Sequence, residues 1–133
     1  NKVWEFDPIP KELNVGGGNV WTAMAVDQRR DLVYLPTSSP SPDFYGGLRP
    51  GDNRWANSLV ALKASSGELV WAQQLVRHDI WDYDLPSQPT LLEVNVNGIQ
   101  IPAVIQTTKQ GYVFSFNRGP LTDPHNSKCC AAQ

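Results

Sequence analysis

The densest group of chemically active side chains lies in a short acidic segment, residues 77–84, which reads Arg-His-Asp-Ile-Trp-Asp-Tyr-Asp. Its three carboxylates are Asp79, Asp82 and Asp84, and so much like charge requires a nearby cation, a metal ion or full solvation. A carboxylate in such a segment can serve as a general base or as a ligand of a hard cation. The same pattern also fits an ordinary solvated acidic loop anchored by Trp81, and its spacing is not that of an EF-hand. By itself the segment leaves both interpretations open.

Other segments carry weaker chemical signals. Residues 16–19, Gly-Gly-Gly-Asn, do not form a phosphate-binding loop, because no Lys-Ser/Thr follows and the next segment resembles a strand. The serines at positions 38, 39 and 41 are interrupted by Pro40 and indicate a turn rather than a nucleophile elbow. The adjacent Cys129 and Cys130 can form neither a disulfide framework nor a four-ligand zinc site.

Short strands joined by tight polar turns must position these residues. The clearest hairpin spans residues 91–101, where apolar residues alternate around Asn97-Gly98. We expect further strand pairs at 58–62 with 68–71 and at 22–26 with 32–35, and a strand at 111–116 that returns along 101–107. This pattern predicts an all-β fold, a meander of antiparallel strands as in sandwiches, barrels and propeller blades.

Two long loops interrupt the meander, at residues 37–55 and 76–89, and such loops between tightly turned strands are where function usually lies. The second contains the acidic segment. Between them, residues 61–71 fit the pattern Ala-x-x-x-x-x-Gly-x-x-x-Trp, in which Gly67 closes a turn and Trp71 can dock a large ring between neighbouring sheets. The same pair is also compatible with ordinary core packing.

Composition excludes several classes of protein. The 133 residues include 10 Gly and 11 Pro, scattered so that long helices and coiled coils are disfavoured. No apolar run approaches the ~18 residues of a membrane span. The net charge is −2 and Lys and Arg do not cluster, so no nucleic acid is expected as a partner. The sequence begins without Met or a signal segment, and we interpret it as an excerpt of a larger protein.

Four ordered blocks give the chain a resemblance to a known family. They are residues 4–10 (Trp-Glu-Phe-Asp-Pro-Ile-Pro), 18–21 (Gly-Asn-Val-Trp), 36–47 and 78–90, and the last, which begins His-Asp-Ile-Trp-Asp-Tyr-Asp, is highly specific. Over roughly residues 2 to 118 the chain resembles the pyrroloquinoline-quinone (PQQ)-dependent dehydrogenases, most closely their glucose-dehydrogenase-like branch. The resemblance implies an eight-bladed β-propeller, of which 133 residues would supply two or three blades of four antiparallel strands at about 40 to 50 residues each.

The resemblance also implies roles for individual residues. Asp82, which follows the Trp of the last block, resembles the catalytic base, and Lys109, 27 positions later, corresponds to a basic residue that contacts the quinone. Trp21 resembles the indole that forms the floor under the cofactor ring. Ser39, 18 positions after Trp21, stands where relatives often carry an Asn that ligates calcium. This is a departure, because a hydroxyl is a poorer calcium ligand than an amide carbonyl. Asp82 would share the metal, Ca²⁺ or Mg²⁺.

The resemblance implies PQQ as the cofactor, a glucose-like aldose or an alcohol as the substrate, and a quinone or a cytochrome as the electron acceptor in the periplasm. We expect residues 1–118 to form the partial propeller and residues 119–133 a divergent or disordered tail. A partial propeller leaves sheet edges unpaired, so self-association is also expected. Two alternatives stay open: a non-catalytic propeller repeat that binds partners or assists assembly, and a small independent β domain that binds a ligand through its aromatic residues.

Overall fold

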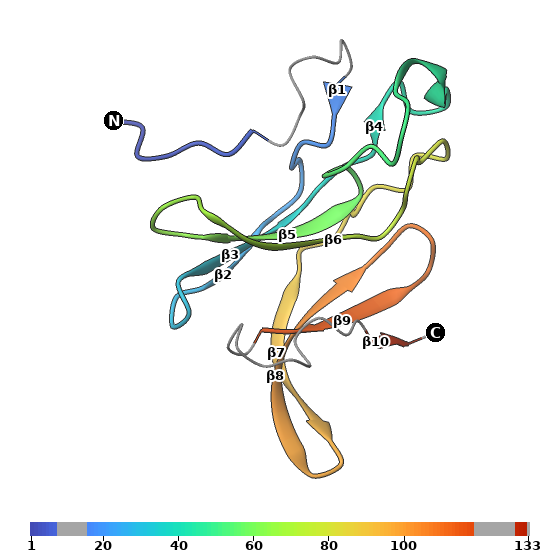
Figure 1. Cartoon of the computed structure of the whole chain (residues 1–133). Helices are drawn as coiled ribbons and strands as arrows, with labels where there is room; N and C mark the ends of the chain where they lie inside the picture. Colours follow the sequence, from blue (N-terminus) through green and yellow to red (C-terminus); the bar gives the residue numbers. More distant parts are fainter. Residues whose placement is uncertain (8–15, 119–129, 133) are drawn as a thin grey trace.

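The computed structural model describes residues 1–7, 16–118 and 130–132, and for the last of these segments the backbone alone. It contains two four-stranded antiparallel sheets and a separate two-stranded pair (Figure 1). In each large sheet the strands follow one another in chain order, as in a meander. The prediction of an all-β antiparallel fold is therefore confirmed. Within the described residues, no helix has the length and apolar character that a bilayer span requires.

The first sheet has the order β2-β3-β5-β6. Its strands are β2 (Ala25–Asp27), β3 (Leu32–Pro36), β5 (Ser58–Lys63) and β6 (Leu69–Gln74). The two predicted hairpins of this region are present, with β2 shorter than expected. Its predicted first residues are engaged elsewhere, since the Thr22 hydroxyl donates to the Pro86 carbonyl and the Met24 carbonyl accepts a hydrogen bond from the Gln88 side chain.

The second sheet has the order β10-β9-β8-β7. Its strands are β7 (Thr90–Val96), β8 (Ile99–Thr107), β9 (Val113–Asn117) and β10 (Cys130–Ala132). The Asn97-Gly98 turn has positive φ at both residues (53° and 85°), as a type I′ hairpin requires. Gly111 (φ 82°) belongs to the turn before β9, because its N–H bonds back to the Thr108 carbonyl.

The predicted tail, residues 119–133, lies mostly outside the described residues. Its last part forms β10, which pairs antiparallel with β9 with Cys130 opposite Ser115. This strand could not be predicted from the sequence, since three small residues show neither alternation nor a turn signal.

A shared apolar core joins the two large sheets. Tyr34, Leu59 and Ala61 of the first sheet are fully buried and belong to one cluster with Val104 and Phe116 of the second. The Trp71 ring lies 5.9 Å from that of Tyr34 and 5.6 Å from that of Phe116, between centroids. Trp71 therefore lies between neighbouring sheets, as its position after Gly67 suggested.

The other face of the first sheet carries a second cluster around Val33, Val60 and Leu62, covered by Trp4 and Phe6 of the N-terminal segment. The Trp4 indole donates a 2.9 Å hydrogen bond to the Ala64 carbonyl. Its ring lies against Gly67, where a Cβ would come within 2.6 Å of ring carbon Cε3. Gly67 also has φ +73°, so both backbone conformation and ring contact require glycine there.

An ion pair also connects the sheets. Arg118, directly after β9, pairs with Asp27 at the end of β2 and donates a 3.0 Å hydrogen bond to the Ala103 carbonyl of β8. Arg30 pairs with the same Asp27 oxygen at 3.0 Å, and Glu93 lies 3.3 Å from Arg118.

Candidate functional site

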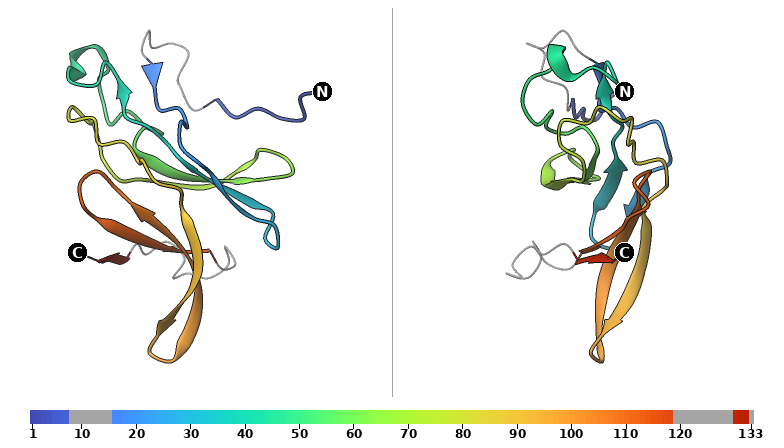
Figure 2. Two further views of the ribbon diagram at one scale, coloured as in Figure 1. Left: turned by 180° about the vertical axis from the view of Figure 1, so that it is seen from behind. Right: turned by 90° about the vertical axis from the view of Figure 1, so that its right-hand side faces the viewer.

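Two long connections lie beside each other at one end of the sheets (Figures 1 and 2). The first, between β3 and β5, contains the short strand β4 (Pro40–Ser41), which pairs with β1 (Gly16–Gly17), and the 3-10 turn η1 (Gly46–Leu48). The second, between β6 and β7, has no strand, as predicted. The sequence pattern did not reveal β1, β4 or η1, because two- and three-residue elements are shorter than any periodicity can indicate.

The fully buried Arg49 ties the two connections together. Its guanidinium donates to the Pro42 carbonyl at 3.0 and 3.2 Å and to the Asp43 carbonyl within its own loop, and to the Asp79 carbonyl in the other. The Asn53 side-chain oxygen accepts a further hydrogen bond at 2.6 Å. A buried guanidinium requires such complete hydrogen bonding.

The acidic segment forms a tight turn organised by Asp79, which is 1% exposed. The Asp79 carboxylate accepts hydrogen bonds from the backbone N–H groups of Trp81 (2.8 Å) and Tyr83 (2.7 Å), and from the Asn57 amide (2.8 Å). Asp82, between those two N–H groups, has φ +60°. The alternative interpretation of this segment as an ordinary solvated acidic loop does not hold for Asp79, because that side chain is buried.

Four polar side chains meet where the connections approach the turn between β8 and β9. The Ser39 hydroxyl donates to Asp82 Oδ1 at 3.0 Å, and the Ser39 backbone N–H donates to Asp84 Oδ1 at 2.6 Å. Lys109 Nζ lies 3.1 Å from Asp82 Oδ2, 2.9 Å from Asp84 Oδ2 and 3.0 Å from the Asp82 carbonyl. We call these four residues the Asp82 cluster. The fold thus brings together three of the four residues predicted to form a site, Ser39, Asp82 and Lys109.

The charges of the cluster support one another. Burial raises the pKa of Asp84, but hydrogen bonds from the Ser39 N–H and from Lys109 outweigh burial and lower it overall. Burial lowers the pKa of Lys109, but Asp84 and Asp82 outweigh this and raise it. At neutral pH, Asp84 is therefore an anion and Lys109 a cation. The side chains of Lys109 and Asp82 remain about one-third exposed (34% and 36%), so solvent and ligands can reach them.

Trp21, the fourth predicted residue, lies on a segment that runs beside the cluster. Residues 18–22 are held there by hydrogen bonds from Gly18 N to Ser39 O (3.0 Å), from Ser38 N to Asn19 O (2.8 Å) and from the Thr22 hydroxyl to Pro86 O. The Trp21 side chain is 55% exposed, and within the described residues it makes no ring contact. The structure brings its backbone to the cluster and leaves its indole open to solvent.

Metal ligation was predicted for Ser39 and Asp82. Asp43 Oδ1 approaches the Ser39 hydroxyl at 3.4 Å, so a hydroxyl and two carboxylates converge. Among residues 1–7, 16–118 and 130–132, however, no three His, Cys, Asp or Glu side chains form a metal-binding group.

The sequence-based prediction missed Asp84, Asp43, Asp79, Asn57 and Arg49. Asp84 and Asp79 belong to the acidic segment, so their type was noticed but not their contacts. Arg49 lies in a Pro- and Gly-rich stretch, where no pattern of local sequence indicates burial.

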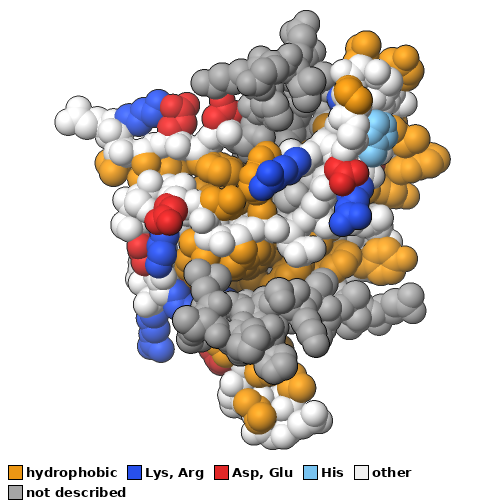
Figure 3. Space-filling view, viewed as in Figure 1, with side chains coloured by type: hydrophobic (Ala, Val, Ile, Leu, Met, Phe, Trp, Pro, Cys, Tyr) orange, Lys and Arg blue, Asp and Glu red, His pale blue; other side chains and the backbone are white. Residues whose placement is uncertain are grey.

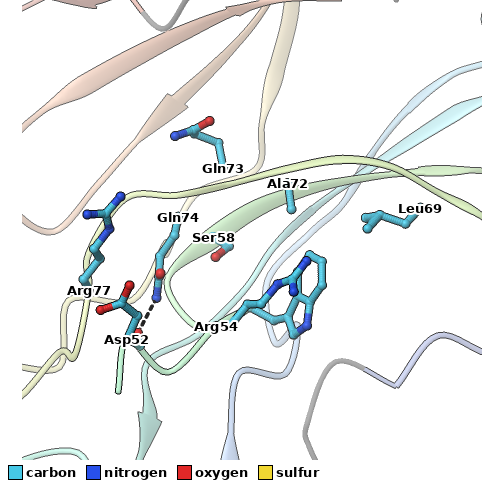
Figure 4. Close-up of a pocket in the computed structure, with 9 residues that line it drawn as sticks. Asp52, Arg54, Ser58, Leu69, Ala72, Gln73, Gln74 and Arg77 are labelled. Atoms are coloured by element: carbon cyan, nitrogen blue, oxygen red, sulfur yellow. Dashed lines mark hydrogen bonds between the residues drawn. The ribbon is translucent and has the colours of Figure 1, made fainter. Parts of the chain in front are cut away.

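A cavity of about 300 Å³ lies elsewhere, on the face of the first sheet formed by β5 and β6 (Figure 4). Arg54 and Arg77 line it, and the Arg54 guanidinium lies 4.2 Å from the centre of the Trp55 ring. Gln74 fixes its rim by donating to the Asp52 carbonyl at 2.7 Å. No member of the Asp82 cluster lines this cavity.

Exposed hydrophobic side chains gather over the loop that contains η1, at the upper right of the space-filling view (Figure 3). They include Phe44 (75% exposed), Tyr45 (63%) and Leu48 (64%).

Comparison with known proteins shows the family of the chain. Residues 1–120 match the family of PQQ-dependent glucose/ethanol/alcohol dehydrogenases, β-propeller domain. The quinoprotein glucose dehydrogenase of Escherichia coli K12 is 40% identical over 95% of this chain and 18% of its own length. Quinoprotein glucose dehydrogenase A of Acinetobacter calcoaceticus is 44% identical over 87% of this chain and 16% of its own.

Solved structures give the same result. A europium-containing methanol dehydrogenase superposes with a TM-score of 0.72 at 30% identity, over 77% of this chain and 18% of that one. The quinohemoprotein alcohol dehydrogenase of Comamonas testosteroni superposes with a TM-score of 0.71 at 29% identity, over 77% and 16%. The chain spans less than a fifth of the length of these proteins. The resemblance found in the sequence is thus confirmed, and the chain belongs to the family of PQQ-dependent dehydrogenases with a β-propeller fold.

Proposed function

We propose that this chain supplies part of the active site of a PQQ-dependent dehydrogenase, with Asp82 as the catalytic base and Lys109 as a ligand of the quinone. The observation that supports this most strongly is the contact between the two side chains, Lys109 Nζ to Asp82 Oδ2 at 3.1 Å. The residues are 27 positions apart, and both remain partly exposed after the fold has brought them together. An accessible carboxylate beside a fixed cation suits the removal of a proton while negative charge develops nearby.

The residues present fit PQQ by the chemistry of their donors. PQQ, when bound, supplies an ortho-quinone that accepts a hydride from the substrate. The three N–H donors of Lys109 bond the Asp82 carbonyl, Asp82 Oδ2 and Asp84 Oδ2. Lys109 would hold the quinone oxygens by exchanging one of its bonds to Asp82 for a bond to the cofactor. Trp21 would provide a flat apolar surface under the ring, and its indole is exposed enough to do so.

Asp82 would take the hydroxyl proton of the substrate. The Ser39 hydroxyl and the Lys109 ammonium each occupy one of its carboxylate oxygens, which leaves lone pairs free on both. Asp84 bonds the Lys109 ammonium through Oδ2, while its Oδ1 accepts the Ser39 backbone N–H. Asp84 therefore orients the cation, and its own burial (8% exposed) keeps it from the substrate.

A hard cation such as Ca²⁺ would fit the same place in part. The Ser39 hydroxyl and the carboxylates of Asp82 and Asp43 are the oxygen ligands that Ca²⁺ prefers, yet they supply fewer than the six to eight it takes. The remaining ligands would come from the cofactor, water or residues outside the described part of the chain. Metal binding by Ser39 and Asp82 therefore stays a proposal.

For the substrate we propose a glucose-like aldose or an alcohol, with a quinone or a cytochrome as the electron acceptor, in the periplasm. The substrate class is supported by similar proteins, which include glucose dehydrogenases, a glycerol dehydrogenase large subunit and a quinohemoprotein alcohol dehydrogenase.

The proposal is tested by Asp82→Asn in the complete dehydrogenase that carries this chain. We expect turnover to fall by about 10²- to 10⁴-fold, because the amide cannot accept the substrate proton. PQQ binding, followed by the absorbance of the cofactor, should persist. Asp52→Asn is the matched control, since the Asp52 side chain is exposed and lies outside the cluster. Undiminished turnover in Asp82→Asn, or a complete protein that shows neither PQQ binding nor dye reduction, would favour a non-catalytic propeller module.

A further inference from the structure

The buried carboxylate of Asp79 accepts hydrogen bonds from the backbone on both sides of the proposed base, Asp82. Its two N–H donors belong to Trp81 and Tyr83, the residues immediately before and after Asp82. A side chain that bonds the backbone two and four residues ahead fixes a tight turn locally. At 1% exposure, the Asp79 carboxylate meets no competing water, so these hydrogen bonds persist.

These two hydrogen bonds matter because Asp82 adopts a backbone conformation that non-glycine residues rarely take. Its φ of +60° lies in the left-handed region, and such a residue persists only where its surroundings compensate for the strain. The flanking N–H groups supply that compensation. Without it, the Asp82 backbone would relax to negative φ and carry the carboxylate away from Ser39 and Lys109.

Further residues hold Asp79 itself. The Asn57 amide donates to Asp79 Oδ2 and also to the Tyr83 carbonyl at 2.9 Å, so it bridges the carboxylate and the turn. The Arg49 guanidinium donates to the Asp79 carbonyl. Asn57 and Arg49 are fully buried, and both come from the connection between β3 and β5. The acidic turn is therefore fixed from the neighbouring loop as well as from within.

We propose that Asp79 is a positioning residue, which holds Asp82 in the conformation needed for proton transfer without touching the substrate or cofactor. This inference rests on the proposed function of Asp82. Proton transfer depends steeply on geometry, and a displacement of about 1 Å can cost about 10²-fold in rate. Asp79 would contribute to catalysis through that geometry.

The first test measures amide exchange in the complete dehydrogenase that carries this chain, comparing Asp79→Asn with Asp52→Asn. Asparagine has nearly the shape of aspartate, but it presents an NH₂ group where a backbone N–H must be accepted. We expect the amides of Trp81 and Tyr83 to exchange about tenfold faster or more in Asp79→Asn, and those of the buried strand β5 to keep their wild-type rates. Unchanged exchange at 81 and 83, or equal acceleration throughout the chain, would overturn the proposal. Asn57→Ser, which removes one donor to the carboxylate, should give a smaller acceleration at the same two amides.

The second test is kinetic and uses the complete dehydrogenase. Asp79→Asn should lower kcat by about 10- to 100-fold while KM for the substrate and the occupancy of PQQ stay near wild type, as expected for a misplaced base in an intact binding site. If Asp82→Asn retains full turnover, the proposed function itself fails. If Asp82→Asn is inactive and Asp79→Asn has wild-type kcat, the function stands and the positioning role is wrong.

Discussion

Two clusters of charged residues join the same pair of sheets at opposite ends of β9. Lys109 lies in the turn that precedes β9 and pairs with Asp82 and Asp84, whereas Arg118 follows β9 and pairs with Asp27. Each cluster combines a cation of the second sheet with carboxylates from the region of the first. They differ in exposure: the side chains of Arg118 and Asp27 are 10% and 5% exposed, and those of Lys109 and Asp82 are 34% and 36%.

This difference separates a structural contact from a candidate reactive one. Burial raises the pKa of Asp27, but hydrogen bonds from Arg118 and Arg30 outweigh it and keep that pKa low. The Arg118 guanidinium is also bonded to the Ala103 carbonyl and approaches Glu93, so it has little capacity left for a ligand. The Asp82 cluster keeps solvent access on both charged groups. We therefore expect the sealed pair to contribute to stability and the open pair to be accessible to a ligand.

The largest effect on stability should follow from breaking the sealed pair. Arg118→Met leaves the Asp27 carboxylate buried with Arg30 as its remaining partner, so we expect the free energy of unfolding to fall by about 3 kcal/mol. Denaturant unfolding of the chain measures this. Arg29→Met, at an exposed neighbouring arginine, is the control and should change stability by less than about 0.5 kcal/mol. Equal stability of Arg118→Met and Arg29→Met would show that the two clusters do not differ as described.

A smaller effect on stability should follow at the open cluster. Lys109→Gln removes a partly exposed cation, and because solvent screens such pairs we expect a loss of less than about 1 kcal/mol. The same substitution should clearly weaken PQQ binding, measured by titrating the complete dehydrogenase with the cofactor. A loss of stability as large as that of Arg118→Met, with PQQ affinity unchanged, would reverse the assignment of roles.

The smallest effect concerns alkaline pH. The pKa of Lys109 is raised by folding, so its contribution to stability is complete below the unfolded pKa of about 10.4 and is lost as pH rises through the higher folded value. The wild-type chain should therefore lose slightly more stability above about pH 10 than Lys109→Gln does. Unfolding curves at pH 8 and pH 11 test this. Identical losses in both chains would mean that Lys109 is not paired in solution.

Acid acts on both clusters in the same direction. The folded pKa values of Asp27 and Asp84 are lowered, so their contributions are complete above the unfolded pKa of about 3.9 and are lost as pH falls through the folded values. Acid therefore does not distinguish the two clusters, whereas alkali acts on the Lys109 ammonium of the open cluster.

Local sequence determined much of the fold. The Asn97-Gly98 turn needs positive φ at two successive residues, so the position of this hairpin could be predicted. Its strands pair farther than expected, from Thr90 to Ile105, and Val96 and Ile99 beside the turn stay exposed. Gly67 and Trp71 similarly indicated a turn and an inter-sheet ring. The specific blocks, above all residues 78–90, identified the family, and the family suggested Asp82, Lys109, Trp21 and Ser39.

Only the tertiary structure decided how those residues meet. Asp79, Asp82 and Asp84 have the same chemistry in the sequence, yet Asp79 is sealed against backbone N–H groups, Asp84 bonds Lys109 from a nearly buried position, and Asp82 stays open. The partners of Asp82 and Asp84 in the cluster, Ser39 and Lys109, lie 25 to 45 residues away in the chain, on loops without any periodic pattern. Periodicity reports which face of a strand is buried, whereas the environment of a loop carboxylate depends on which distant donors the packing of the sheets delivers to it.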